Sequence, residues 1–162
     1  MYYLEVFSLL NKFGVRYLVV GGVALVLHGV LRLTADLDLF VDLAEDNAAK
    51  FLKALKTLGY KPKLPVDPSK LADPIVRSEW VNKKNMKVFS FIQSKDDYKI
   101  IDVFVTEPIP FEEAYKRRQK IKANDVSISV ISADDLIALK KASGRDQDIA
   151  DLKMLKELLH KK

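Results

Sequence analysis

The sequence contains no cysteine and only two histidines, His28 and His160. The absence of cysteine excludes disulfide bonds and thiolate metal ligands, and it fits a cytoplasmic protein. With only two histidines, a histidine-rich zinc site is not expected either. Candidate metal ligands in this chain are therefore carboxylates.

Long apolar runs are also missing. The longest run, residues 17–30, is interrupted by Gly21, Gly22 and His28, and a membrane span needs about 18 consecutive residues. The N-terminus has no basic segment ahead of an apolar stretch, so no signal peptide is expected. These features predict a cytoplasmic protein without membrane spans.

The chain has 162 residues, of which 49% are hydrophobic, and this is enough for one domain with its own core. Its net charge of +5 fits either an ordinary solvated surface or attraction to nucleotide phosphates or RNA. Helical and strand-like segments alternate along the chain, which predicts an α/β fold with a mixed sheet. We expect a single domain over residues 1–162, with its core at about 15–131 and a helical segment at about 132–160.

Apolar periodicity gives the expected elements. Helices are expected at residues 2–13, 23–30, 45–58, 111–118, from 132 until Gly144, and at 146–159. Strands are expected at residues 15–20, 35–41, 75–80, 86–92, 100–106 and 126–131, and the proline-rich residues 61–74 are expected to form a loop. In the last helix, the inward face is expected to carry Ile149, Leu152, Leu155 and Leu159.

Two aspartates stand inside an apolar run, and a third occupies the same kind of position later in the chain. Asp36 and Asp38 are two residues apart, so on a strand they point to one face, about 7 Å apart. Asp102 lies in a second strong strand, and three carboxylates converge if the two strands are neighbours. Their mutual repulsion then requires cations, and hard oxygen ligands suit Mg²⁺ or Mn²⁺. The alternative is that these acids are solvated at strand ends or paired with Arg32 or Lys99.

A glycine pair precedes the first two aspartates. Gly21 and Gly22 follow one strand and precede a helix, where their backbone amides could hold a phosphate or simply form a turn. Thr34 shares the side of the strand that carries Asp36, and Arg32 fits a partner that is either a carboxylate or a phosphate. The chain has no P-loop and no Rossmann glycine motif.

The order and spacing of Gly21-Gly22, Asp36-x-Asp38 and Asp102 resemble the minimal nucleotidyltransferases of the DNA polymerase beta-like superfamily. The resemblance covers about residues 15–155. The version with Gly-Gly and Arg-x-Thr-x-Asp-x-Asp is most similar to the branch that contains abortive-infection-type toxins and small hypothetical nucleotidyltransferases of thermophiles.

The C-terminal segment is similar to that branch as well. Lys140, Arg145, Asp148 and Asp151 fall at the positions of its Leu-x-x-Lys…Arg-x-x-Asp-x-x-Asp signature. The resemblance implies that Lys140 contacts the triphosphate or the acceptor, and that Arg145, Asp148 and Asp151 orient it or complete the pocket. The alternative for these residues is ordinary pairing of charges on a helix surface.

The resemblance implies transfer of a nucleoside monophosphate from an NTP to a hydroxyl acceptor. In this reading Asp36, Asp38 and Asp102 bind two divalent metal ions, Mg²⁺ or Mn²⁺, and Gly21 and Gly22 approach the phosphates. Arg32, Thr34, Arg145 and Asp148 complete the nucleotide site, and Lys140 joins the aspartates in catalysis. Many family members have a serine after the first glycine, and Gly22 departs from that pattern because it has no hydroxyl.

Three further readings stay open at this point. The chain could be a non-catalytic nucleotide-binding module, or a toxin–antitoxin interaction module with an antitoxin partner or as a homodimer. It could also be a metal-dependent nuclease that uses the same carboxylates. For a transferase, the acceptor could be RNA, a protein side chain or a small molecule.

Overall fold

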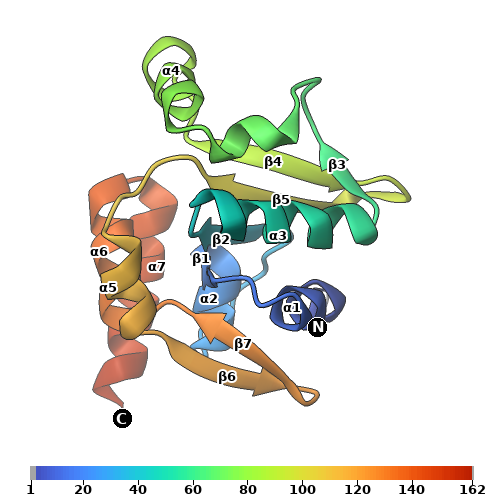
Figure 1. The fold of residues 1–162 in the computed structure, drawn as a ribbon. Helices are drawn as coiled ribbons and strands as arrows, with labels where there is room; N and C mark the ends of the chain where they lie inside the picture. The colour runs from blue at the N-terminus through green and yellow to red at the C-terminus, as the bar shows by residue number, and fades with distance from the viewer. Residues whose placement is uncertain (1–2, 162) are drawn as a thin grey trace.

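A computed structural model describes residues 3–161 of the chain. Its seven strands form one mixed sheet in the order β3-β4-β5-β2-β1-β7-β6 (Figure 1). The strands are β1 (Tyr17–Val20), β2 (Leu37–Val41), β3 (Tyr60–Pro62), β4 (Val88–Gln93), β5 (Asp96–Phe104), β6 (Gln119–Ala123) and β7 (Val126–Val130). The α/β class and the mixed sheet expected from the sequence are confirmed.

The sheet is flanked by helices, among them α5, α6 and α7, which gather at one side of the molecule (Figure 1). The helices are α1 (Leu4–Lys12), α2 (Gly21–Leu27), α3 (Glu45–Thr57), α4 (Pro74–Lys84), α5 (Phe111–Lys116), α6 (Ala133–Ser143) and α7 (Asp146–His160), with a 3₁₀ helix, η1 (Pro68–Ala72). None of the described helices is both long and apolar enough to cross a membrane.

The central strands place three polar residues, Asp38, Asp102 and Ser90, in one row across β2, β5 and β4. β2 runs antiparallel to β1 and parallel to β5, and its Asp38 lies opposite Val20 on one side and opposite Asp102 on the other. On β4, Ser90 lies opposite Asp102. Because residues two apart share a face, Leu37 and Leu39 point away from this row and are fully buried.

The segment expected to form a strand at residues 75–80 is instead helix α4, so the predicted strand pair with residues 86–92 is wrong. Asp73 caps this helix: its Oδ1 accepts hydrogen bonds from the amides of Ile75 and Val76, at 2.9 and 3.4 Å. Pro74 occupies the first helical position, where its fixed φ favours a helix. A capped helix start therefore overrides the strand propensity of the following residues.

Two further expectations need correction. Strand β6 was not expected, and it is a polar edge strand that pairs antiparallel with β7. In α7, the inward face carries Asp148, Asp151 and Leu155, whereas Ile149 and Leu159 are exposed. The apolar stripe predicted for this helix is therefore wrong, because its buried face is largely charged.

Candidate active site

Asp38 and Asp102 lie opposite each other on the neighbouring strands β2 and β5, which is the condition that the sequence analysis set for their convergence. Both side chains are only half-buried, so ligands can reach them. Asp36 lies in the bend before β2, because the strand begins at Leu37 and not at residue 35 as expected. Neither Arg32 nor Lys99 pairs with these carboxylates: Arg32 binds Asp151, and Lys99 contacts Glu5.

The electrostatics of the site oppose ionisation of its central acid. Burial, followed by the charges of Asp102 and Asp36, raises the pKa of Asp38 to about 7, although Lys140 and Arg145 act in the opposite direction. Burial and the charge of Asp102 also raise the pKa of Asp36, against the lowering effect of Lys63. The negative charges of the three carboxylates thus repel one another, and a bound cation would reduce this repulsion.

The raised pKa of Asp38 predicts a pH-dependent stability. The folded state holds this proton more tightly than the unfolded state, whose Asp pKa is 3.8. Stability is therefore fully present below about pH 4 and is lost as the pH rises toward 7. Asp38→Asn removes this cost, so without divalent cations we expect it to stabilise the fold by about 2–4 kcal/mol at pH 8 and far less at pH 4.

Denaturant unfolding of the wild type and of Asp38→Asn at both pH values measures this effect. Glu79→Gln, a change of an exposed residue on α4, is the matched control and should leave the stability unchanged at both pH values. Equal stability of Asp38→Asn and the wild type at pH 8 would contradict the assignment.

Ser90 also lies at the site, although no motif in the sequence singles it out. Its Oγ donates a hydrogen bond to Asp102 Oδ1 at 2.5 Å, and its backbone carbonyl accepts the amide of Lys63 at 2.9 Å. Only the pairing of β4 with β5 brings Ser90 to Asp102. The hydroxyl therefore fixes the orientation of the carboxylate.

Position 21 requires glycine. Its φ is +67°, a left-handed conformation that favours glycine, and a Cβ there would overlap Asp38 Oδ2. The start of α2 therefore lies directly against the Asp38 carboxylate.

Gly22 is equally confined, by a different neighbour. A Cβ at Gly22 would lie 2.5 Å from Thr34 Oγ1 and 3.0 Å from Thr34 Cβ. Arg32 is also near, with its Nη1 3.5 Å from the same point. The exposed hydroxyl of Thr34 therefore lies in the space that a side chain at position 22 would take.

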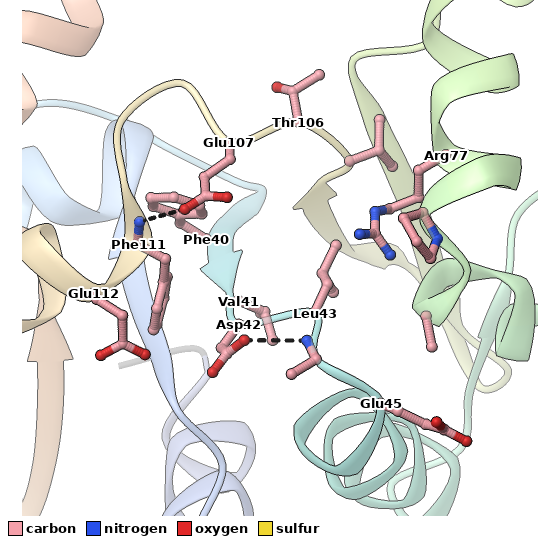
Figure 2. Close-up of a pocket in the computed structure, with 14 residues that line it drawn as sticks. Phe40, Val41, Asp42, Leu43, Glu45, Arg77, Thr106, Glu107, Phe111 and Glu112 are labelled. Atoms are coloured by element: carbon pink, nitrogen blue, oxygen red, sulfur yellow. Dashed lines mark hydrogen bonds between the residues drawn. The ribbon is translucent and has the colours of Figure 1, made fainter.

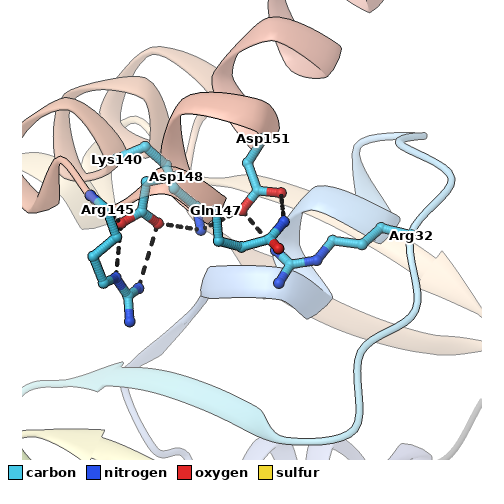
Figure 3. A network of polar contacts seen from close by, with 6 residues as sticks. All are labelled: Arg32, Lys140, Arg145, Gln147, Asp148 and Asp151. Atoms are coloured by element: carbon cyan, nitrogen blue, oxygen red, sulfur yellow. Dashed lines mark hydrogen bonds and ion pairs between the residues drawn. The ribbon is translucent and has the colours of Figure 1, made fainter.

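A charged network connects α6, α7 and the segment before β2 (Figure 3). Lys140 Nζ donates to Asp148 Oδ1 at 3.1 Å and to Asp151 Oδ2 at 3.0 Å. Arg145 Nε contacts Asp148 at 2.8 Å, and Arg32 Nη1 contacts Asp151 at 2.7 Å. We call these five residues the ion-pair network.

The ion-pair network is buried at its centre, which excludes ordinary surface pairing. Asp148 and Asp151 have no exposed surface, and Lys140 is 7% exposed. Burial opposes the charged form of Asp148, but hydrogen bonds from Arg145 and Lys140 outweigh it and hold the pKa of this acid well below its usual range. Gln147, which the sequence did not single out, also donates to Asp151, at 2.9 Å. The network therefore holds Arg32 against Asp151 and Arg145 against Asp148.

A cavity lies beyond the C-terminal end of β2 (Figure 2). It encloses about 440 Å³, and its walls carry the carboxylates of Asp42, Glu45, Glu107 and Glu112. Asp42 and Glu112 are neutralised by Arg16, which lies 2.8 and 2.6 Å from them. None of the three site aspartates lines this cavity, so it is separate from them.

The carboxylates do not form a ready-made metal cage. Among the side chains that the structure describes, those of residues 3–96 and 98–161, no three of His, Asp or Glu are grouped closely enough to hold a metal ion. The expected convergence of three carboxylates is thus limited to the pair Asp38 and Asp102, with Asp36 outside the strand. This arrangement still fits Mg²⁺, which proteins commonly bind through one or two carboxylates together with substrate phosphates.

The sheet, the glycine turn and the paired aspartates define the chain as a nucleotidyltransferase by fold. Residues 5–160 match the family model described as "Nucleotidyltransferase of unknown function (DUF6036)", and the chain belongs to this family. No curated protein matches it significantly in sequence.

Solved structures share this fold. The lincosamide antibiotic adenylyltransferase LnuA, bound to lincomycin, is 18% identical with a TM-score of 0.60, and the alignment covers 93% of this chain and 92% of LnuA. ANT(2″)-Ia in complex with adenylyl-2″-tobramycin is 11% identical with a TM-score of 0.60, covering 96% and 86%. TM1012 from Thermotoga maritima is 13% identical with a TM-score of 0.58, covering 98% and 90%.

Proposed function

We propose that this protein transfers a nucleoside monophosphate from an NTP to a hydroxyl acceptor. The observation that carries the proposal is the pairing of Asp38 with Asp102, with Asp38 directly against Gly21 at the start of α2. The family and the fold support it, and two structural neighbours are an antibiotic adenylyltransferase bound to lincomycin and a protein in complex with adenylyl-2″-tobramycin.

The reaction can be written on the residues of the site. The acceptor oxygen forms a bond to the α-phosphorus of the NTP while the bond from that phosphorus to the β-phosphate oxygen breaks, and pyrophosphate leaves. Asp102, oriented by Ser90, takes the hydroxyl proton and passes it to solvent. Mg²⁺ or Mn²⁺, held by Asp38 and Asp102 with Asp36 nearby, would supply charge neutralisation of the phosphates.

The cationic side of the site faces the triphosphate in this proposal. Arg145 is 74% exposed, yet Asp148 holds its guanidinium, and the charge of Asp38 acts on it. Arg32 is held in the same way by Asp151. Lys140 donates hydrogen bonds to Asp148 and Asp151, the two acids that hold these arginines. A direct contact of Lys140 with the triphosphate or the acceptor stays a prediction from the sequence.

Transfer of label from an α-³²P-labelled NTP with Mg²⁺ or Mn²⁺ tests the function. We expect label to appear on an acceptor with release of pyrophosphate, and Asp102→Asn to reduce the rate at least a hundredfold, as loss of a general base does. Glu79→Gln serves as the matched control. No NTP binding at millimolar concentration with metal would exclude the proposal, and RNA hydrolysis without NTP would favour a nuclease.

Thr34 is expected to supply the hydroxyl that Gly22 lacks. A hydrogen bond to a charged phosphate contributes about 1.5–3 kcal/mol, so Thr34→Ala should weaken NTP binding roughly tenfold to a hundredfold. Gly22→Ser places its Cβ against Thr34 and should destabilise the fold by about 1–3 kcal/mol.

The double variant Gly22→Ser/Thr34→Ala makes this test specific. It removes the overlap with Oγ1 and returns one hydroxyl to the same space, so stability and NTP affinity should both recover toward the wild type. Calorimetric NTP titration and thermal unfolding of all four proteins give the result. A double variant no better than Gly22→Ser alone would show that the two positions do not exchange roles.

A further inference from the structure

A second cavity, of about 250 Å³, reaches Ser90, the hydrogen-bond partner of Asp102. It is lined by Lys63, Leu64, Met86, Val88, Phe89 and Ser90. Ser90 belongs to both features, because it lines the cavity and donates its hydroxyl hydrogen to Asp102 Oδ1. A molecule in this cavity is therefore one side chain away from the carboxylate that takes the acceptor proton in the proposed reaction.

The walls of this cavity are mostly apolar and incompletely covered. Leu64 is 53% exposed, and Met86 and Val88 are only half-buried, while Phe89 belongs to the core. Apolar surface left open in this way gains about 25 cal/mol per Å² when a ligand removes it from water. The cavity thus suits a ligand with an apolar body.

Lys63 supplies the positive charge in the wall of this cavity, and its charge also acts on the carboxylate of Asp36. Lys63 is the one charged residue among the six that line it. Lys83, Lys84 and Lys87, all exposed, flank Met86 in the chain. The larger cavity of Figure 2 has the opposite character, with four carboxylates and Arg77 in its walls. A negatively charged ligand complements the smaller cavity, whereas a cationic ligand would face Lys63.

We propose that this cavity binds the acceptor, and that the acceptor is a small hydroxyl compound with an apolar body and an anionic group held by Lys63. The proposal rests on the proposed function, because it assigns the acceptor side of that site. The volume is below the usual 300–1,000 Å³ of sites for drug-sized ligands, so a compact molecule is expected. Its hydroxyl would lie toward Ser90 and Asp102, and its anionic group toward Lys63.

Three probes with the same ring and hydroxyl but different charge test this assignment. They are 4-hydroxyphenylacetate, which is anionic, 4-hydroxyphenylethanol, which is neutral, and tyramine, which is cationic. NMR titration of the methyl signals of Leu64, Met86 and Val88 measures binding to the whole chain. We expect the anionic probe to bind at least tenfold more tightly than tyramine.

Charge variants show whether Lys63 causes this preference. Lys63→Met should equalise the three probes, and Lys63→Glu should reverse their order. Lys61→Glu makes the same charge change two residues away on β3, at an exposed residue outside the lining, and should keep the wild-type order. An unchanged order in Lys63→Glu, or equal binding of all three probes to the wild type, would overturn the proposal.

The outcome is separable from that of the proposed function. NTP binding and pyrophosphate release are measured without these probes. If neither is detected, the transferase is excluded, whereas the charge preference of the cavity could still be present. Conversely, label transfer to RNA with no binding of any of the three probes would support the transferase and overturn the assignment of a small anionic acceptor.

Discussion

Asp38→Asn is expected to lower the rate of nucleotidyl transfer at least a thousandfold, which corresponds to about 4 kcal/mol of transition-state stabilisation. Asp38 is the carboxylate that faces both Asp102 and the Gly21 turn, so it lies between the proposed acceptor and phosphate sites. Asparagine keeps the shape of the side chain but removes its negative charge, and with it the attraction for a divalent cation.

The same substitution should leave the fold intact or more stable, because it removes a carboxylate whose ionisation burial opposes. Lower activity together with higher stability at pH 8 is the signature of a functional carboxylate, and a structural residue would show the reverse. Single-turnover label transfer and denaturant unfolding on the same samples give both values. A variant with more than a tenth of the wild-type rate would contradict this role.

Lys140→Met is expected to have the largest effect on stability, a loss of about 3–5 kcal/mol. Lys140 is 7% exposed, and its ammonium group is shared by Asp148 and Asp151, which have no exposed surface. Removal of the lysine leaves the two buried carboxylates with less positive charge around them. The loss of stability on breaking a buried ion pair typically falls in this range. Arg32 and Arg145 stay attached to the two acids, which places the expected value toward the lower end.

Lys141→Met is the matched control, because Lys141 is exposed on the same helix and should change stability by less than about 0.5 kcal/mol. Lys140→Met/Asp151→Asn should lose less than the sum of the two single variants, since the second change removes the charge that the first leaves unpaired. Additive losses would show that Lys140 and Asp151 do not interact energetically.

The strand carboxylates were predictable because their signal is local. Alternation with period two places Asp38 and Asp102 each on the face of its own strand opposite the apolar residues, and acids within apolar runs stand out at once. Their exact pairing needed the structure, because the register of β2 and β5 depends on contacts between residues 64 apart, Asp38 and Asp102.

The parts that sequence reasoning missed depend on distant partners. The buried face of α7 was misread because an apolar periodicity cannot detect buried charges, and Asp151 becomes buried through Lys140 and through Arg32, 119 residues away. Ser90 carries no motif, and only its pairing opposite Asp102 gives it a role. The helix α4 was missed for a different reason: the capping pair Asp73-Pro74 is a local signal that outweighed the β-branched residues after it.

The contact between position 22 and position 34 has an evolutionary consequence. Because a Cβ at Gly22 would lie 2.5 Å from Thr34 Oγ1, the two positions cannot both carry a hydroxyl side chain in this arrangement. Related sequences with serine at position 22 are therefore expected to carry glycine or alanine at position 34, and those with glycine at 22 to carry threonine or serine at 34. The two residues would then change as a pair, so that the lineage keeps one hydroxyl in the site while it moves between two segments of the chain.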